Sequence, residues 1–149
     1  MTDIMVSILT KYERLDRFFQ SFGFITFSRR GFKEIIDVLP DAKIKELASN
    51  NAASVVEFID FRFKKRDLDN LIGTLEILSK YQRKFDYDLL RNNSGVVITL
   101  RTDLGEKFTL FLSEQYRAVI TDVLGVAPIV ELGRNQVTFR IGKSQPSGK

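Results

Sequence analysis

The hydrophobic pattern of the chain changes its period near residue 84, and this change limits the possible folds more than any other feature. Before it, apolar residues recur every three or four positions, as in residues 3–22, which predicts amphipathic helices. After it, residues 85–101 alternate around the turn sequence Asn92-Asn93-Ser94-Gly95, which predicts a β-hairpin. Two further predicted strands, 129–132 and 136–141, follow another helical stretch. The sequence therefore predicts an α+β fold.

Hairpin, helix and hairpin follow one another directly in the second half, so we expect an antiparallel sheet with a helix packed on one face. The first half should be helical with one short strand at Phe24–Phe27. A length of 149 residues is that of one domain. We predict a single α+β domain over 1–142, helix-rich over 1–84 and sheet-rich over 85–142. The tail 143–149 has no apolar anchor, and we expect it to be disordered.

Capping residues divide the helical half into separate predicted helices. Asp41 should begin a short helix. Ser54 stands three residues before Glu57 and forms a capping box, in which each side chain satisfies the other's backbone N–H, so it predicts another helix start. Asp67 or Asp69 should open the helix that leads to the change of period.

The chain has no histidine and no cysteine, which removes triads, thiol nucleophiles and ordinary zinc ligation. Carboxylate chemistry remains, because Asp86 and Asp88 would project to one side of a strand, as paired Mg²⁺ ligands must. This segment resembles a restriction-type nuclease core, but Thr99-Leu100-Arg101 stands where that core has Glu-x-Lys. A solvent-facing acidic edge is the better interpretation. We predict that the chain is not an enzyme and has no metal site and no cofactor.

The net charge of +4 favours nucleic acid as a partner, although the excess is spread almost evenly along the chain. Three short basic clusters stand out, and each is flanked by acids, so a solvated surface is the alternative for each. One of them is Lys80 with Arg83 and Lys84. The other two contain our candidate nucleic-acid-binding residues, which are Arg29, Arg30, Lys33, Arg62, Lys64, Lys65 and Arg66.

The segment Gln20–Phe27 resembles the RNP1 element of RNA-recognition motifs, with six of eight positions in agreement. In that family the element lies on a central strand that follows an earlier strand and helix. Here only an amphipathic helix precedes it. Core phenylalanines at a helix end are therefore the better interpretation.

The first predicted helix has a wide apolar face that cannot stay exposed on a single helix. It must pack into the domain or against a second copy of the chain, and we expect a homodimer. The residues that we assign to this contact are Ile4, Ile8, Tyr12, Leu15 and Phe19. No run approaches the roughly 18 apolar residues of a membrane span. We therefore expect no membrane association and a cytoplasmic location.

Four short segments carry a broader resemblance, namely Ile8–Tyr12, Leu15–Phe18, Phe22–Phe24 and Leu100–Phe108. With them, most of residues 4–141 resembles a family of little-characterised archaeal regulator-like proteins. In that family, a ribbon-helix-helix DNA-binding element leads into an α+β domain through a similar helix. The family pattern has a histidine before Asp-Leu-Gly, where this chain has Thr102, so no role of that histidine is carried over.

The resemblance implies a non-enzymatic regulatory or interaction domain, equivalent to the effector or dimerisation part of an archaeal transcription regulator. DNA binding is implied by kinship alone, because no ribbon strand precedes the first helix. Two alternatives remain open. One is direct binding of DNA or RNA through the basic clusters, and the other is a sensor domain for an unknown small molecule.

Overall fold

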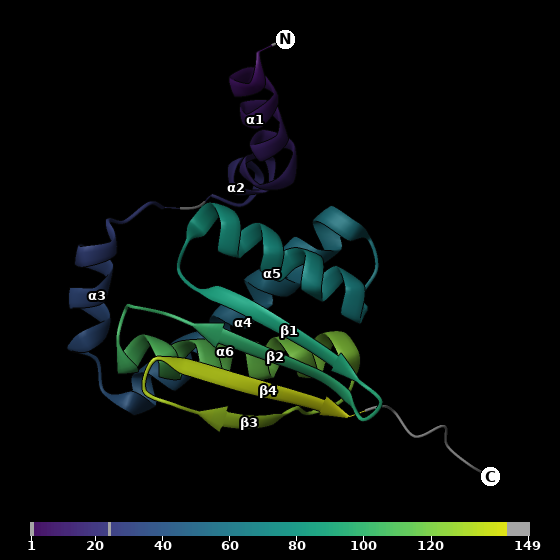
Figure 1. The fold of residues 1–149 in the computed structure, drawn as a ribbon. Helices are drawn as coiled ribbons and strands as arrows, with labels where there is room; N and C mark the ends of the chain where they lie inside the picture. Colours follow the sequence, from purple (N-terminus) through teal and green to yellow (C-terminus); the bar gives the residue numbers. More distant parts are fainter. Residues whose placement is uncertain (1, 24, 143–149) are drawn as a thin grey trace.

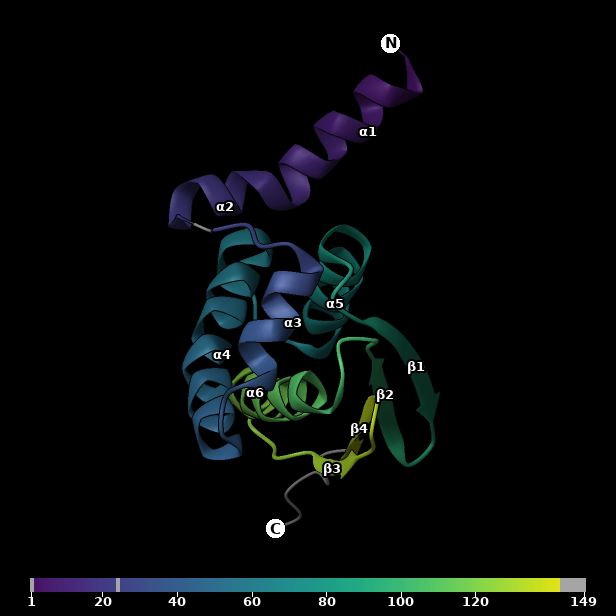
Figure 2. The same cartoon turned by 90° about the vertical axis from the view of Figure 1, so that its left-hand side faces the viewer.

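The structure is a computed structural model, and it describes residues 2–23 and 25–142. Within that part the fold is α+β, with a four-stranded antiparallel sheet in the C-terminal half (Figure 1). Helix α6 (Glu106–Leu124) lies on one face of the sheet, and α4 (Asp41–Phe63) packs along α6 on the side away from the sheet (Figure 2). The buried hydrophobic residues between these layers form one cluster, from Leu15 to Ile141.

The sheet confirms both predicted hairpins. Strands β1 (Asp86–Asn92) and β2 (Gly95–Arg101) form the first, and β3 (Ile129–Leu132) and β4 (Gln136–Gly142) form the second. The hairpins join through β2 and β4, so the strand order is β1-β2-β4-β3. Alternate residues of the two central strands are buried, among them Ile98, Leu100, Val137, Phe139 and Ile141. The predicted helix on one face of the sheet is α6.

Gly95 closes the first hairpin in a backbone conformation that no side chain tolerates here. Its φ is 145°, and a Cβ atom would lie 2.1 Å from the carbonyl oxygen of Ile141. Strand β4 can therefore approach the turn only because residue 95 is glycine.

Helix α5 (Leu68–Gln82) begins as the sequence predicts, because the Asp67 carboxylate accepts a hydrogen bond of 2.9 Å from the backbone N–H of Asn70. The helix ends at Arg83, which adopts the left-handed conformation with φ 52°. This sharp end directs the chain straight into Phe85 and strand β1 (Figure 1).

The predicted helix start at Ser54 is wrong. Helix α4 runs without interruption through 23 residues, from Asp41 to Phe63, and Ser54 lies inside it. Its buried side is continuous across that point and packs on α6; the buried residues are Ile44, Ala48, Ala52, Val55, Val56, Phe58 and Ile59. Within a continuous helix, the backbone N–H groups that a capping box serves are already bonded, so the local signal has no effect.

The predicted strand at Phe24–Phe27 is also wrong over residues 25–27. Phe24 lies outside the described residues, and residues 25–27 have no regular structure. Ile25 is 81% exposed and Phe27 58% exposed. The described sheet consists of β1, β2, β4 and β3 in that order, and residues 25–27 pair with none of these strands. The predicted tail, 143–149, lies outside the described residues.

The predicted helix over residues 3–22 is present as an N-terminal arm that projects from the body (Figure 2). It comprises α1 (Asp3–Lys11), a π-helical turn at Tyr12–Asp16 and α2 (Arg17–Phe22), and Gly23 ends it at φ 70°. The arm bends between α1 and α2, where the π turn interrupts the regular hydrogen bonding.

A short helix, α3 (Arg29–Asp37), follows the arm and begins where the hydroxyl of Ser28 accepts a hydrogen bond from the N–H of Gly31. Among residues 2–23 and 25–142, no helix is both long and apolar enough to cross a membrane.

Candidate functional site

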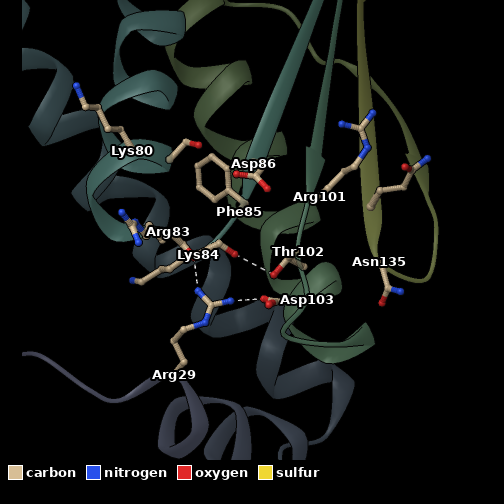
Figure 3. A pocket seen from close by; sticks show the side chains of 12 residues that line it. Arg29, Lys80, Arg83, Lys84, Phe85, Asp86, Arg101, Thr102, Asp103 and Asn135 are labelled. Atoms are coloured by element: carbon tan, nitrogen blue, oxygen red, sulfur yellow. Dashed lines mark hydrogen bonds and ion pairs between the residues drawn. The ribbon is translucent and has the colours of Figure 1, made fainter.

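A cleft with a volume of about 680 Å³ opens where the C-terminal end of α5, the start of α3 and the ends of β1 and β2 meet (Figure 3). Five Arg or Lys residues and two Asp residues line it, and we call it the basic cleft. Its lining residues are Arg29, Ser79, Lys80, Arg83, Lys84, Phe85, Asp86, Arg101, Thr102, Asp103, Asn135 and Gln136.

Thr102 holds three segments together at the floor of the basic cleft. Its hydroxyl donates a hydrogen bond of 2.9 Å to the Lys84 carbonyl and accepts one of 3.2 Å from the N–H of Leu104. Its own N–H donates to the Asn135 carbonyl at 2.9 Å. The position where the resembling family has histidine is therefore a buried structural joint in this chain, with 8% of the residue exposed.

Arg29 forms one wall of the basic cleft by joining α3 to two distant segments (Figure 3). Its guanidinium donates to the carbonyl oxygen of Arg83 and to the carboxylate of Asp103. Arg29 is thus the member of the predicted nucleic-acid set that reaches this site, and its charge is already paired there.

The remaining cations leave the basic cleft with uncompensated positive charge. Within the described part of the chain, Lys80, Arg83 and Lys84 have no ion-pair partner, and Asp86 is the one lining carboxylate without a partner. Arg101 pairs with Asp88. The cleft therefore offers an excess of free positive charge to an anion.

Lys84 has the most distinctive surroundings of these cations. Lys84 as a whole residue is exposed. Its ammonium nitrogen nevertheless lies 5.7 Å from the centroid of the Phe32 ring. Partial burial without a compensating carboxylate lowers the pKa of Lys84 below its ordinary value.

The other predicted nucleic-acid-binding residues lie elsewhere, and all of them except Lys64 form ion pairs. Arg30 pairs with Glu34, Lys33 with Asp37, Arg62 with Glu13, Lys65 with Asp67, and Arg66 with both Asp60 and Asp122. Lys64 lies over the Phe61 ring at 5.4 Å. Hydrogen bonding from Arg66 lowers the pKa of Asp60, as expected of a close pair.

The structure does not unite the predicted clusters. Lys64, Lys65 and Arg66 precede the first residue of α5, whereas Lys80 and Arg83 lie at its other end. A helix of 15 residues separates the two groups by roughly 22 Å. The cluster at the C-terminal end was visible in the sequence, but nothing there indicated that Arg29 and Arg101 would join it.

The predicted dimer residues divide into two groups. None of residues 3–11 is buried; Ile4 is 72% and Ile8 61% exposed, and Tyr12 follows with 44%. Leu15, in contrast, is buried in the core of its own chain, and Phe19 is half-buried against it. Of the five predicted dimer residues, only Ile4, Ile8 and Tyr12 therefore remain exposed for contact with a second chain.

Asp86 and Asp88 lie on the exposed face of β1, as the alternation predicts. Among the described residues, no group of three or more Asp and Glu side chains is placed to hold a metal ion.

No protein-family model, curated protein or solved structure matches this chain. The chemistry of its own side chains is therefore the basis for a functional interpretation.

Proposed function

We propose that this chain is a non-enzymatic regulatory domain that binds a small multiply charged anion in the basic cleft. The observation that carries the proposal is the convergence of Lys80, Arg83 and Lys84 on one cleft without ion-pair partners among the described residues. An anion bound in the cleft would compensate these charges and so stabilise the folded chain. This role corresponds to the effector-binding part of the archaeal regulators that the sequence resembles.

The distribution of charge favours a small anion over nucleic acid. A nucleic-acid surface needs a stripe of free cations that follows successive phosphates. Here Lys80, Arg83 and Lys84 gather at one end of α5. At the other end, Arg66 is engaged by Asp60 and Asp122, so the unpaired charge does not continue along the helix as a stripe of free cations. The planar guanidinium of Arg83 suits two oxygens of one anion, and Lys80 adds a mobile point charge.

Isothermal titration calorimetry with inorganic pyrophosphate tests this proposal. We expect binding to the unmodified chain and a loss of about tenfold or more in affinity for Arg83→Gln and Lys80→Gln, since each removes a charge-assisted contact. Glutamine keeps much of the side-chain length, and at residue 83 it has the same left-handed backbone cost as arginine. The matched control is Lys45→Gln, which removes an exposed cation on α4 that does not line the cleft.

Two results would overturn the proposal. One is the absence of pyrophosphate binding at low salt, and the other is equal loss of affinity in the Lys45→Gln control. A short DNA duplex and a single strand are titrated in parallel. Tighter, steeply salt-dependent binding of either, weakened by Arg83→Gln, would instead identify the cleft as a nucleic-acid surface.

A second proposed function is self-association through α1, carried by the complete lack of buried residues in that helix. Its exposed apolar side chains include Ile4, Met5, Ile8 and Leu9. The helix has Asp3 in its first turn and Lys11 in its last, so antiparallel pairing of two copies would place opposite charges near each other. We therefore propose a second copy of the chain as the partner, in a two-fold symmetric contact.

Sedimentation equilibrium measures this contact. Ile8→Glu should shift a dimer to monomer, because burying an unpaired carboxylate at the contact is costly. Val38→Glu is the matched control, since Val38 is also an exposed apolar residue but lies after α3. A monomeric parent chain, or an equal effect of both substitutions, would contradict the proposal.

A further inference from the structure

An apolar cavity with a volume of about 200 Å³ lies beside the basic cleft, between α4, α6 and the end of α5. Aromatic rings from α2, α3, α4, α6 and the residue before β1 form most of its wall, and we call it the aromatic cavity. The aromatic residues in this wall include Phe18, Phe32, Phe58, Phe85, Phe108 and Tyr116.

Two pairs of rings in the wall of the aromatic cavity pack edge against face. Phe85 and Tyr116 have centroids 5.6 Å apart with planes at 78°, and Phe32 and Phe108 have centroids 5.4 Å apart at 83°. This arrangement is the favourable one for aromatic side chains, and it fixes their orientation. These two packed pairs form part of the cavity wall.

Polar side chains line the cavity beside the rings, namely Asn51, Ser54, Gln82, Lys84 and Gln115. The amide of Gln115 donates a hydrogen bond of 2.6 Å to the side-chain oxygen of Asn51, and both residues line the cavity. Tyr116 is buried, and burial raises the pKa of its hydroxyl well above the ordinary value, so the hydroxyl stays neutral. An occupant of this space would therefore meet aromatic rings together with neutral polar groups and Lys84.

Lys84 borders both the aromatic cavity and the basic cleft. Its backbone carbonyl is held by the hydroxyl of Thr102, and its ammonium lies over the Phe32 ring. Among the described residues, no carboxylate lies within ion-pair distance of it. A cation is thus fixed at the opening of an apolar cavity.

We propose that the aromatic cavity binds a monocarboxylic acid with a single aromatic ring, whose carboxylate pairs with the ammonium of Lys84. An apolar cavity of about 150 Å³ is large enough to hold benzene, so 200 Å³ accommodates a ring that carries one short substituent. A neutral apolar ligand would leave Lys84 uncompensated, whereas a carboxylate supplies the missing charge. The inference does not rest on pyrophosphate binding, because Lys80 and Arg83 do not line this cavity.

Calorimetric titration with phenylacetate, and with benzyl alcohol as its neutral counterpart, tests the assignment. We expect phenylacetate to bind the unmodified chain more tightly than benzyl alcohol. Lys84→Met keeps the apolar stem and removes the charge, and should weaken phenylacetate about tenfold or more without weakening benzyl alcohol. Lys45→Met, which changes an exposed cation on α4 that lines neither the cleft nor the cavity, should leave both affinities unchanged.

A second variant tests the location of the ring. Ser54 lies within α4 and lines the aromatic cavity. Leucine is a good helix former, so Ser54→Leu should keep the helix and fill the space. The affinities for both phenylacetate and benzyl alcohol should fall. Urea unfolding of each variant separates a blocked cavity from a damaged fold.

Three outcomes would overturn the inference: no phenylacetate binding at millimolar concentration, equal affinity in Lys84→Met, or unchanged affinity in a folded Ser54→Leu. If phenylacetate fails while pyrophosphate still binds in an Arg83-dependent way, the aromatic cavity is wrongly assigned and the proposed anion site stands. If pyrophosphate does not bind and phenylacetate does, the proposed anion site is wrong and the assignment of the aromatic cavity stands.

Discussion

Two glycine substitutions separate the cost of an unfavourable φ from the cost of a steric clash. Gly125 ends α6 at φ 69°, with no atom within 4 Å of the position that an added methyl group would occupy, whereas at Gly95 that position lies 2.1 Å from the Ile141 carbonyl oxygen. Gly125→Ala should therefore cost only the left-handed conformation, about 1–2 kcal/mol in the free energy of unfolding. Gly95→Ala carries a comparable backbone cost and must also move β4.

The required movement sets the size of the second effect. Ordinary van der Waals contact begins near 3.4 Å, so the Ile141 carbonyl must retreat by more than 1 Å from the added methyl group. Residues 95 and 142 are the last pair of the β2–β4 ladder, and such a retreat separates them. Losing one or two ladder hydrogen bonds adds about 1–3 kcal/mol, which gives about 2–5 kcal/mol in total for Gly95→Ala.

Urea unfolding followed by far-ultraviolet circular dichroism measures both variants against the parent chain. A domain of this size is stable by about 5–15 kcal/mol, so the Gly95→Ala variant should lose a large part of its stability. If its unfolding free energy falls by no more than that of Gly125→Ala, the close approach of β4 to the turn is not a property of the protein, and the reasoning is refuted.

Three further predictions concern packing and charge. Phe58→Ala should cost about 3–5 kcal/mol in urea unfolding, because the buried ring packs edge-on to Phe18 and leaves a cavity; a cost below that of an exposed Ile25→Ala would contradict this packing. The hydrogen bond from the Asn70 N–H depresses the pKa of Asp67, so its stabilising effect is present above the unfolded pKa and is lost as pH falls through the folded pKa. Asp67→Ala should therefore destabilise the fold at neutral pH, and its difference from the parent should shrink in acid, as urea midpoints across pH would show. Burial lowers the pKa of Lys84, so the charged form opposes folding, and Lys84→Met should raise the urea midpoint at neutral pH; a lower midpoint would show that Lys84 is stabilised instead.

The sequence predicts the sheet well because its signals are local. Alternation over residues 85–101 and the turn chemistry before Gly95 specify a hairpin without reference to the rest of the chain. The start of α5 at Asp67 is equally local. The prediction failed at Ser54, where a local capping signal competes with packing of a long helix on α6, and packing determines the structure.

The basic cleft could not be predicted, because its parts are brought together only by the fold. Arg29 reaches the Arg83 carbonyl across 54 positions of sequence and Asp103 across 74. Arg30 and Lys33 pair with acids four residues away in α3, as flanking acids suggest in the sequence. Arg66, in contrast, is also engaged by Asp122 of α6, and that pairing depends on a tertiary contact that the sequence does not show.

The π turn at Tyr12–Asp16 divides the arm into two amphipathic segments that are out of phase. A π turn contains one more residue than an α turn, and each residue of an α-helix advances the side-chain direction by about 100°. The stripe that appears continuous in the sequence is therefore offset at this turn. Leu15 and Phe18 are directed into the body, whereas Ile4 and Ile8 are left outside. The two ends of the arm thus differ in role: Leu15 and Phe18 anchor it in the body, whereas α1 lies clear of the body and leaves its surface free (Figure 2).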